Sequence, residues 1–583
     1  MENKYKIAVC KYELFLNLSN VKYGEGQMKI RLVYGLILPV IMPMALSNNA
    51  AGQAIVPGQS SQLPPAPVAP QAIPDVRIEH RGAPPETGPV GPSVVVNALH
   101  ITGATRFSEA QLIAVTGFTP GHEANLSDLR HMAVAITDFY NAHGYVVAQA
   151  YLPAQEIKDG VVTIAVIEGR YGAVKLRNQS KVHDGVAQDI LDGLDKGDLV
   201  EAGPLDRRLL LLSDLPGVDV RSTLSPGSDV GTSDLLVDLN PGPTVTGEID
   251  ADNYGSPYTG AYQGGGTVNF NEPLGWGDVA SVRVLTSGDG MQYVRGSYQG
   301  QLGDVTVGAA YAYFHYRLGK QFEILDANGW EQAASLYASY PVIRSYDDNL
   351  RVLVDADHRI FQDRIDAFST VTDKTANVVT LGVTGDHRDS LGGGGWDNYS
   401  LYVSIGNLDI KTPLARALDA ASLRTQGGYS KLNFSVDRLQ TVYGPFEIFA
   451  GVRGQFAGKN LDITEKMELG GAYGVRAYPE GEDYGDEGYV ATLEGRVWLP
   501  KVWDELPGRM QFVGFVDTGW VRFDKSPFFP GPNSATRSGA GVGLNWADND
   551  DFAVRLAYAH ILGSKPISAP GTGQFWFEVV KFF

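Results

Sequence analysis

Few residues of this sequence stand in patterns that could do chemistry. The sequence contains no phosphate-binding loop, no Gly-x-Ser-x-Gly nucleophile motif and no His-Glu-x-x-His zinc motif. Its single cysteine, Cys10, excludes a disulfide framework, a thiolate zinc site and a Cys-x-x-Cys redox centre. We therefore predict that the protein is not an enzyme and holds no cofactor and no metal.

Two weaker candidates for ligand binding also have ordinary explanations. His100, His122, His131 and His143 lack ligand spacing, so we interpret them as surface or helix residues. The acidic run 548–551 could suggest calcium, but it stands in a predicted short turn, where solvated side chains are the simpler interpretation.

Arg476 is the charged residue with the most specific setting. It lies in a long connection between two predicted strands, within the string Val475-Arg476-Ala477-Tyr478. Several carboxylates follow closely: Glu480, Glu482, Asp483, Asp486 and Glu487. Spacing alone favours a solvated arginine in an acidic loop. A second string, Phe515-Val-Asp517-Thr-Gly519, places its three named residues on one face of a predicted strand.

The composition indicates what kind of scaffold carries these residues. The chain has 583 residues and a formal net charge of -19, which argues against nonspecific nucleic-acid binding. Only 19% of the residues are charged, while Gly (69), Tyr (28) and Phe (23) are abundant. This balance is typical of a β-rich chain with a nonaqueous outer surface.

The N-terminal region indicates export from the cytoplasm. An apolar run at 32–46 follows Lys29 and Arg31, is too short for a transmembrane helix, and precedes small residues. We predict a signal peptide within 1–54, with translation starting at Met28. Residues 55–92 are proline-rich, and we predict an extended linker there.

Two α/β units follow, at 93–171 and 172–244, with one predicted order of strand, helix, helix, strand, strand. In the first unit, a capping box opens a helix at 108–111 and apolar residues at helical spacing mark a helix at 128–142. The predicted strands and remaining helices lie at 93–101, 145–152, 161–168, 172–178, 185–194, 204–215, 218–224 and 232–239.

From 245 to 583, alternating runs replace helical periodicity. Connections alternate between short ones and long ones (318–333, 361–375, 409–424 and 458–486), which favours an antiparallel outer-membrane barrel over a soluble sandwich. Sixteen strands are predicted, at 246–253, 264–271, 278–287, 290–300, 304–317, 334–342, 348–360, 376–388, 397–408, 425–438, 444–457, 487–499, 509–522, 536–546, 551–561 and 573–583.

Several strings resemble those of the outer-membrane transporters of two-partner secretion, the haemolysin and filamentous-haemagglutinin exporters of the POTRA-plus-barrel superfamily. The resemblance covers roughly residues 93–583 and its strings are specific together. They are Gly144-Tyr145, Tyr151-Leu-Pro-Ala-Gln155, Asp159-Gly160, Ile167-Glu-Gly-Arg-Tyr-Gly172, Leu209–Val218, Leu224-Ser-Pro-Gly227, Asp252-Asn-Tyr-Gly255 and Pro273-Leu-Gly-Trp-Gly-Asp278.

The resemblance gives the two strings around Arg476 and Asp517 a role. It implies that the sixth surface loop folds into the pore and that Arg476 pairs with Asp517 on the inner wall, with Gly519 leaving room. A guanidinium can hold a carboxylate through two parallel hydrogen bonds. The family pattern has glycine at the position of Ala477, so alanine would be strained there if the backbone needs a positive φ. The family also has an N-terminal plug helix, and no amphipathic helix is evident between 55 and 93.

The resemblance also implies a function. Two periplasmic POTRA domains would capture an unfolded exoprotein, such as a haemolysin or an adhesin, through its N-terminal secretion domain. We expect capture at the edge strand 145–152, with Tyr145, Val147 and Tyr151 as substrate-binding residues. The barrel in the outer membrane would pass the chain outward. The barrel assembly machinery would recognise the aromatic strand ending in Phe583. An assembly factor that inserts other barrels and a passive porin are the alternatives.

Overall fold

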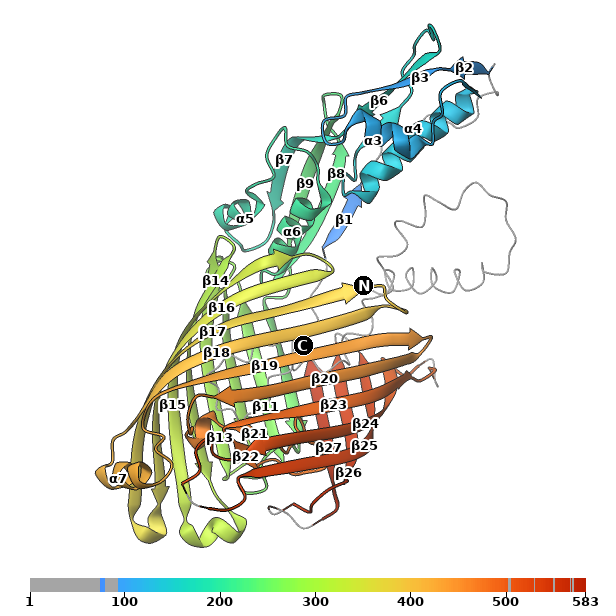
Figure 1. The fold of residues 1–583 in the computed structure, drawn as a ribbon. Helices are drawn as coiled ribbons and strands as arrows, with labels where there is room; N and C mark the ends of the chain where they lie inside the picture. The colour runs from blue at the N-terminus through green and yellow to red at the C-terminus, as the bar shows by residue number, and fades with distance from the viewer. Residues whose placement is uncertain are drawn as a thin grey trace.

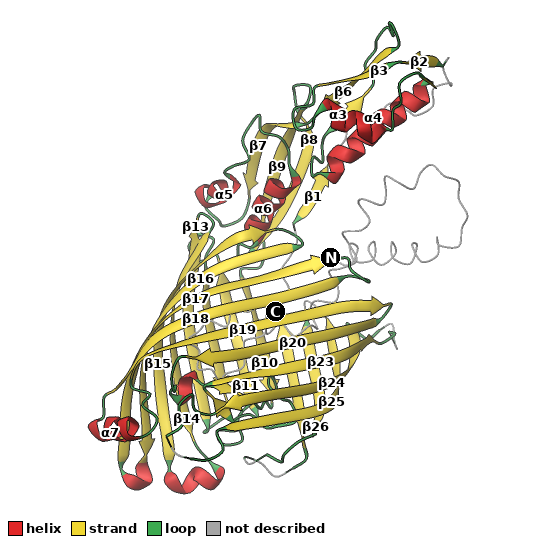
Figure 2. Cartoon of the chain, viewed as in Figure 1, coloured by secondary structure: helices red, strands yellow, loops and turns green. Residues whose placement is uncertain are grey.

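The computed structural model describes residues 74–78, 93–501, 505–528, 530–548, 551–566, 568 and 571–583. The predicted signal peptide, the start at Met28 and most of the proline-rich linker lie outside these residues. Two α/β units lie in line beyond one end of a β-barrel (Figure 1). Helices belong to these two units, apart from short helical turns and α7 at the far end of the barrel (Figure 2). None of the described helices is long and apolar enough to cross a membrane.

The first unit packs two helices on one face of a three-stranded sheet with the order β3-β6-β5. Ser108 caps α3 through the predicted capping box, and Asn125 caps α4 in the same way. The apolar face of α4 is buried against the sheet, including Ile136 and Tyr140. The elements are β2 (Val94–Val96), β3 (Ala98–Thr102), α3 (Glu109–Thr116), β4 (His122–Ala124), α4 (Leu126–Ala142), β5 (Gln149–Tyr151) and β6 (Val161–Ile167).

The second unit repeats this arrangement and gains one strand from the linker. Its sheet has the order β1-β8-β9-β7, and the edge strand β1 pairs in parallel with β8. We predicted only linker at 55–92. The stretch 75–83 contains no proline, so its backbone donors are free to join a sheet edge. The elements are β1 (Asp75–Ile78), β7 (Arg170–Asn178), α5 (Asp184–Leu191), α6 (Ala202–Ser213), β8 (Val218–Pro226) and β9 (Thr232–Pro241).

Residues 245–583 form a closed antiparallel barrel of sixteen strands, as predicted, with β10 paired to β27 to close it. Strand pairing follows chain order all the way round. The strands are β10 (Val245–Asp252), β11 (Gln263–Asn271), β12 (Val279–Thr286), β13 (Met291–Leu302), β14 (Val305–Arg317), β15 (Ala327–Arg344), β16 (Asp348–Ile365), β17 (Thr370–Asp389), β18 (Gly395–Ile410), β19 (Gly427–Tyr443), β20 (Phe446–Ala457), β23 (Glu487–Trp498), β24 (Arg509–Arg522), β25 (Ser534–Asp548), β26 (Phe552–Ile561) and β27 (Gly573–Phe582).

Three predicted long loops are shorter or more ordered than expected. The predicted loops at 318–333 and 361–375 are wrong for much of their length, because β15, β16 and β17 extend through them. Gly329 lies in β15, where a side chain would collide with the ring of Tyr316. Within 409–424, residues Pro413–Ala421 form α7.

The barrel wall is apolar outside and polar inside. Leu493, Val516 and Val542 point outward and are about half exposed, as a lipid-facing surface requires. Their neighbours Glu494 and Asp517 point inward and are buried. This alternation fits a wall with hydrocarbon on one side and a polar lumen on the other.

The second α/β unit is attached to the turns at the near end of the barrel. Arg344 of β15 holds Asp214 through two hydrogen bonds, of 2.9 and 2.7 Å. Arg207 and Arg208 of α6 both pair with Asp304, in the turn between β13 and β14. These partly buried pairs fix the second unit to the barrel.

Candidate functional site

The connection between β20 and β23, residues 458–486, folds back into the barrel. It contains a 3₁₀ turn (Ile463–Glu465) and two short strands, β21 (Met467–Glu468) and β22 (Tyr484–Gly485), which pair with each other. Counted from β10, it is the sixth connection at the end of the barrel away from the α/β units. We call residues 458–486 the lumen loop.

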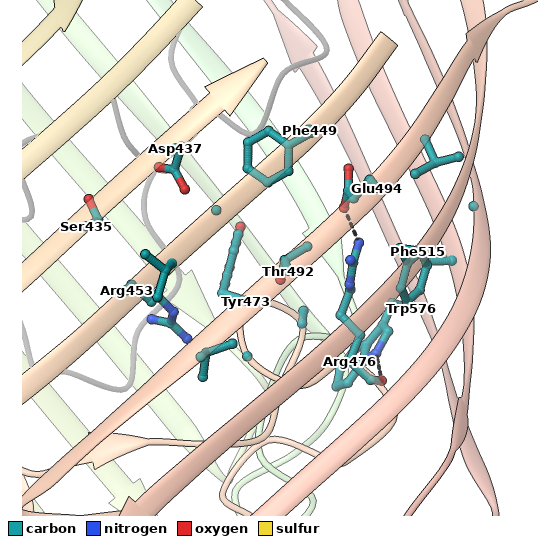
Figure 3. Close-up of a pocket in the computed structure, with 18 of the residues that line it drawn as sticks. Ser435, Asp437, Phe449, Arg453, Tyr473, Arg476, Thr492, Glu494, Phe515 and Trp576 are labelled. Atoms are coloured by element: carbon teal, nitrogen blue, oxygen red, sulfur yellow. Dashed lines mark hydrogen bonds and ion pairs between the residues drawn. The ribbon is translucent and has the colours of Figure 1, made fainter. Parts of the chain in front are cut away.

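Arg476, in the lumen loop, holds two carboxylates of the barrel wall. Its Nε and Nη2 donate to the two oxygens of Asp517 at 2.8 Å each, and its backbone N–H donates to Asp517 Oδ2 at 3.2 Å. Nη1 donates to Glu494 Oε1 at 2.7 Å (Figure 3). The guanidinium carbon lies 3.4 Å from the centre of the Phe515 ring, which adds a cation–π contact.

This ion-pair cluster is buried and its acceptors are well satisfied. The side chain of Asp517 is fully buried, and that of Glu494 is 2% exposed. Asp517 also accepts from Thr492, and Glu494 accepts from Arg496. Removing one partner from such a buried pair leaves an uncompensated charge, at a cost of about 3–5 kcal/mol. The solvated setting that spacing alone favoured for Arg476 is therefore wrong.

The neighbours of Arg476 fit the wall closely. Ala477 is not among the described residues with a positive φ, so the strain considered for alanine does not arise. A side chain at Gly539 would collide with the Cβ of Ala477, so the wall is hollowed opposite this residue. Gly519 likewise leaves room for Leu469 of the lumen loop. Val475 and Tyr478 are fully buried, and the Tyr478 hydroxyl donates to the Ser564 carbonyl.

Further ion pairs hold the lumen loop at other points of the wall. Glu465 pairs with Arg359 of β16 and Lys431 of β19. On the opposite side, Arg537 of β25 pairs with Glu482 and Asp483. Two of the acidic residues that follow Arg476 in the sequence are therefore ion-paired with the wall. The loop is thus fixed to strands on several sides of the lumen.

The last strand also contacts the lumen loop. The Trp576 indole of β27 donates to the Arg476 carbonyl at 2.6 Å (Figure 3). Tyr254, just beyond β10, packs edge-on against both Trp576 and Tyr473 of the loop. Aromatic contacts therefore tie the loop to both strands that close the barrel. We did not predict Glu494 or Trp576 as site residues, although each lies on an alternating strand.

A cavity of about 250 Å³ remains between the lumen loop and the inner wall, lined by strands from β18 to β27. Its polar lining includes Ser400 and Asn433, and also Ser435, Asp437 and Arg453 (Figure 3). The lumen loop therefore leaves part of the lumen unfilled.

The predicted capture strand at 145–152 is shorter than expected. Only Gln149–Tyr151 forms β5, because residues 145–148 make a turn closed by bonds from Tyr145 N–H to Tyr140 and from Ala148 N–H to Tyr145. Tyr145 is buried and accepts a hydrogen bond from Arg106.

The other two predicted capture residues differ in exposure. Val147 packs against the core of the second unit, so it does not face solvent as a free edge. Tyr151 lies on β5 and is 42% exposed. Of the three residues, the structure leaves Tyr151 available on the edge strand.

Glu168 organises the end of the first unit. Its carboxylate accepts from the backbone N–H groups of Thr105 and Arg106 and from the Tyr140 hydroxyl. Burial alone would raise the pKa of Glu168, but these hydrogen bonds hold the pKa below its usual range. Arg106 also pairs with Glu201, which links the two α/β units.

Two α/β units before a sixteen-stranded barrel, with a loop paired to its inner wall, define an outer-membrane transporter of the POTRA-plus-barrel class. Residues 94–169 match the family model for the ShlB-type POTRA domain. Residues 231–546, more than half of the chain, match the haemolysin secretion/activation proteins ShlB/FhaC/HecB. The chain belongs to this family of two-partner secretion transporters, with its barrel in the outer membrane and its POTRA domains in the periplasm.

Individual relatives agree with this assignment. The heme/hemopexin transporter protein HuxB of Haemophilus influenzae is 28% identical over 467 residues, covering 79% of this chain and 82% of that protein. The outer membrane transporter CdiB of Escherichia coli is 24% identical over 479 residues, covering 79% and 78%. The solved structure of CdiB from Escherichia coli superimposes with a TM-score of 0.66 at 21% identity, covering 86% of this chain and 93% of that one. BamA from Haemophilus ducreyi lacking POTRA domains 1–3 has a TM-score of 0.50 at 15% identity, so it shares the fold.

Proposed function

We propose that this protein exports one large exoprotein, in extended form, from the periplasm to the cell surface. The POTRA domains capture the exoprotein through its N-terminal secretion domain, and the barrel passes it outward. The lumen loop, held by Arg476 on Asp517, keeps the lumen narrow until export displaces it. The observation that carries this proposal is the bidentate pair between Arg476 and the fully buried Asp517, because a loop fixed so firmly must be released for a polypeptide to pass.

Export needs a driving force other than nucleotide hydrolysis. The sequence has no phosphate-binding motif. Folding of the β-rich exoprotein outside the cell then pulls the chain through. Since identity to the heme/hemopexin transporter exceeds identity to CdiB, a haem-acquiring exoprotein is the first cargo to test. We propose that the barrel assembly machinery recognises the last strand, β27 (Gly573–Phe582).

The test is secretion of the exoprotein encoded beside this gene, from cells with and without it. We expect the exoprotein to disappear from the medium and to be held in the periplasm, with other barrel proteins at normal levels. A general fall in outer-membrane barrels would instead favour an assembly factor, which the fold likeness to BamA keeps as the second candidate. Small-solute conductance independent of any partner would favour a passive porin.

A further inference from the structure

We propose that the exported chain enters the barrel through a cavity at its junction with the second POTRA domain, and that Asp355 on the inner face of β16 binds a lysine or arginine side chain of that chain. This inference rests on the proposed function and deepens it. It names a site on the path of the exoprotein and the chemistry of the residue that the site takes.

A cavity of about 260 Å³ lies where the second POTRA domain meets the inner wall of the barrel. Ile190 of α5, Leu211 of α6 and Pro216 line it on the POTRA side. Helix α6 lies beside the near end of the barrel (Figure 1). On the barrel side the cavity is lined by β13 to β16, and it reaches Asp355, seven residues beyond the start of β16. The cavity therefore extends from the second POTRA domain along the wall of the lumen.

Asp355 is a buried carboxylate without a partner. The residue is 2% exposed, and neither carboxylate oxygen has a hydrogen-bond partner among the described residues. The arginines near it donate elsewhere, since Arg359 donates to Asp357 and Arg295 donates to Ser297. A charged carboxylate that is buried and unpaired is strongly destabilising. Such a group indicates a ligand of opposite charge.

Carboxylates elsewhere on the inner wall have the partner that Asp355 lacks. Glu248 pairs with Arg283, and Glu578 pairs with Arg555. In both pairs the arginine comes from another strand of the barrel. Asp355 has no such ion pair within the described part of the chain, so the cation that satisfies it comes from outside the wall.

The cation that fits Asp355 is a side chain rather than a metal ion. Calcium takes about six to eight oxygen ligands. The other carboxylates that line the cavity, Asp214 and Asp304, are already paired with arginines. An ammonium or guanidinium group needs only one carboxylate and donates hydrogen bonds to its oxygens. A basic residue of the exported chain supplies such a group.

Arg351 adds a second requirement for the incoming chain. It also lines the cavity, four residues before Asp355 on β16, and its side chain has no ion pair with any described residue. Four residues of extended chain span about 13 Å. An exported segment that lies along β16 therefore meets a cation first and a carboxylate further in. This order favours a segment with an acidic and a basic residue about four positions apart.

The experiment uses the full chain in detergent and a short fluorescent peptide of serine and glycine, with one lysine and one glutamate four positions apart. A matched peptide has norleucine in place of lysine, and binding is measured by fluorescence anisotropy. We expect the wild-type protein to bind the lysine peptide about 10-fold more tightly, as one charge-assisted hydrogen-bonded pair predicts. Asp355→Asn keeps the shape of the side chain and removes its charge, so it should abolish this preference.

Asp348→Asn is the matched control. Asp348 lies on the same strand, seven positions from Asp355, so strand alternation places it on the outer face. Its side chain is 56% exposed and pairs with His387. The same substitution on the other side of the wall should leave the preference for the lysine peptide unchanged.

Disulfide exchange locates the bound peptide. Ser339→Cys introduces a thiol on the wall of the cavity. A lysine peptide with a neighbouring pyridyl-disulfide cysteine should react with this variant faster than with the unsubstituted chain, whose only thiol is Cys10. Adding Asp355→Asn to Ser339→Cys should slow the reaction.

Several results would overturn the inference. They are equal affinity for the two peptides, no binding of either peptide, a preference that survives in Asp355→Asn, loss of the preference in Asp348→Asn, and reaction of Ser339→Cys that does not depend on Asp355. Calcium that stabilises the wild-type protein against heat but not Asp355→Asn would assign a metal ion to the site and would also overturn it. Secretion of the exoprotein decides the proposed function, so the two proposals fail separately.

Discussion

Arg476 in the lumen and Gln155 on the first POTRA domain each hold a partner through two parallel hydrogen bonds. The bonds of Arg476 join charged groups, and its partner Asp517 is fully buried. The bonds of Gln155 join its side-chain amide to the backbone N–H and carbonyl of Thr163 on β6, which are neutral groups at an exposed position. The same two-bond geometry therefore gives contacts of different strength. The buried ion pair is costly to separate, whereas an exposed amide readily exchanges its hydrogen bonds for bonds with water. We infer that the first pair locks the pore and that the second is easily displaced.

Asp517→Ala removes the buried ion pair of Arg476 and has the largest expected effect. It leaves Arg476 buried with Glu494 alone and should destabilise the seated lumen loop by about 3–5 kcal/mol. Limited proteolysis of the purified protein should then cut within 458–486 much faster than in the wild type. Asp289→Ala, at an exposed aspartate between β12 and β13, is the control. An uncleaved loop in Asp517→Ala would contradict the account.

Glu168→Ala tests whether a buried polar contact outside the barrel is as strong as the one that Arg476 makes inside it. It leaves the Thr105 and Arg106 N–H groups and the Tyr140 hydroxyl without their acceptor, so we expect the POTRA transition in thermal unfolding to lose about 3 kcal/mol. Glu156→Ala is the control, because its side chain is 83% exposed, and it should change little.

The same carboxylate predicts a pH dependence in the wild-type protein. Because the pKa of Glu168 is lowered in the folded state, its stabilisation is complete above the unfolded pKa of about 4.3. It is lost as the pH falls through the lower, folded pKa. Thermal unfolding between pH 3 and pH 6 should show this loss in the wild type, and a slope that is unchanged in Glu168→Gln would contradict it.

Trp576→Phe measures the contribution of a neutral hydrogen bond to holding the lumen loop. The ring contacts stay, while the hydrogen bond to the Arg476 carbonyl is lost. We therefore expect the seated lumen loop to lose about 1 kcal/mol of stability. Trp546→Phe loses a similar bond to the Pro507 carbonyl far from the loop. Equal proteolysis rates for the two variants would show that Trp576 does not hold the loop.

The sequence predicts elements better than contacts. All sixteen barrel strands could be predicted because alternation is a local pattern that survives without knowledge of the fold. The extension of β15 through Gly329 could not be predicted, since that glycine makes room for the ring of Tyr316, which lies on the neighbouring strand β14. Tyr145 was misplaced on a strand because the turn at 145–148 depends on bonds back to the end of α4.

In the candidate site, too, one contact could be predicted from the sequence and others could not. The pairing of Arg476 with Asp517 was expected from the family strings, and the structure places the two together. Glu494 and Trp576 follow only from how the lumen loop folds, since they lie 18 and 100 residues further along the chain. Spacing alone gives no signal for such partners.

The most direct test of the central claim is a double-mutant cycle on export. Secretion of the exoprotein is measured for the wild type, Arg476→Ala, Asp517→Ala and the double variant at equal levels of transporter in the outer membrane. If the pair acts as one lock, the second substitution adds little to the first, and the coupling is large. Strictly additive defects would show that Arg476 and Asp517 act separately and would contradict the account.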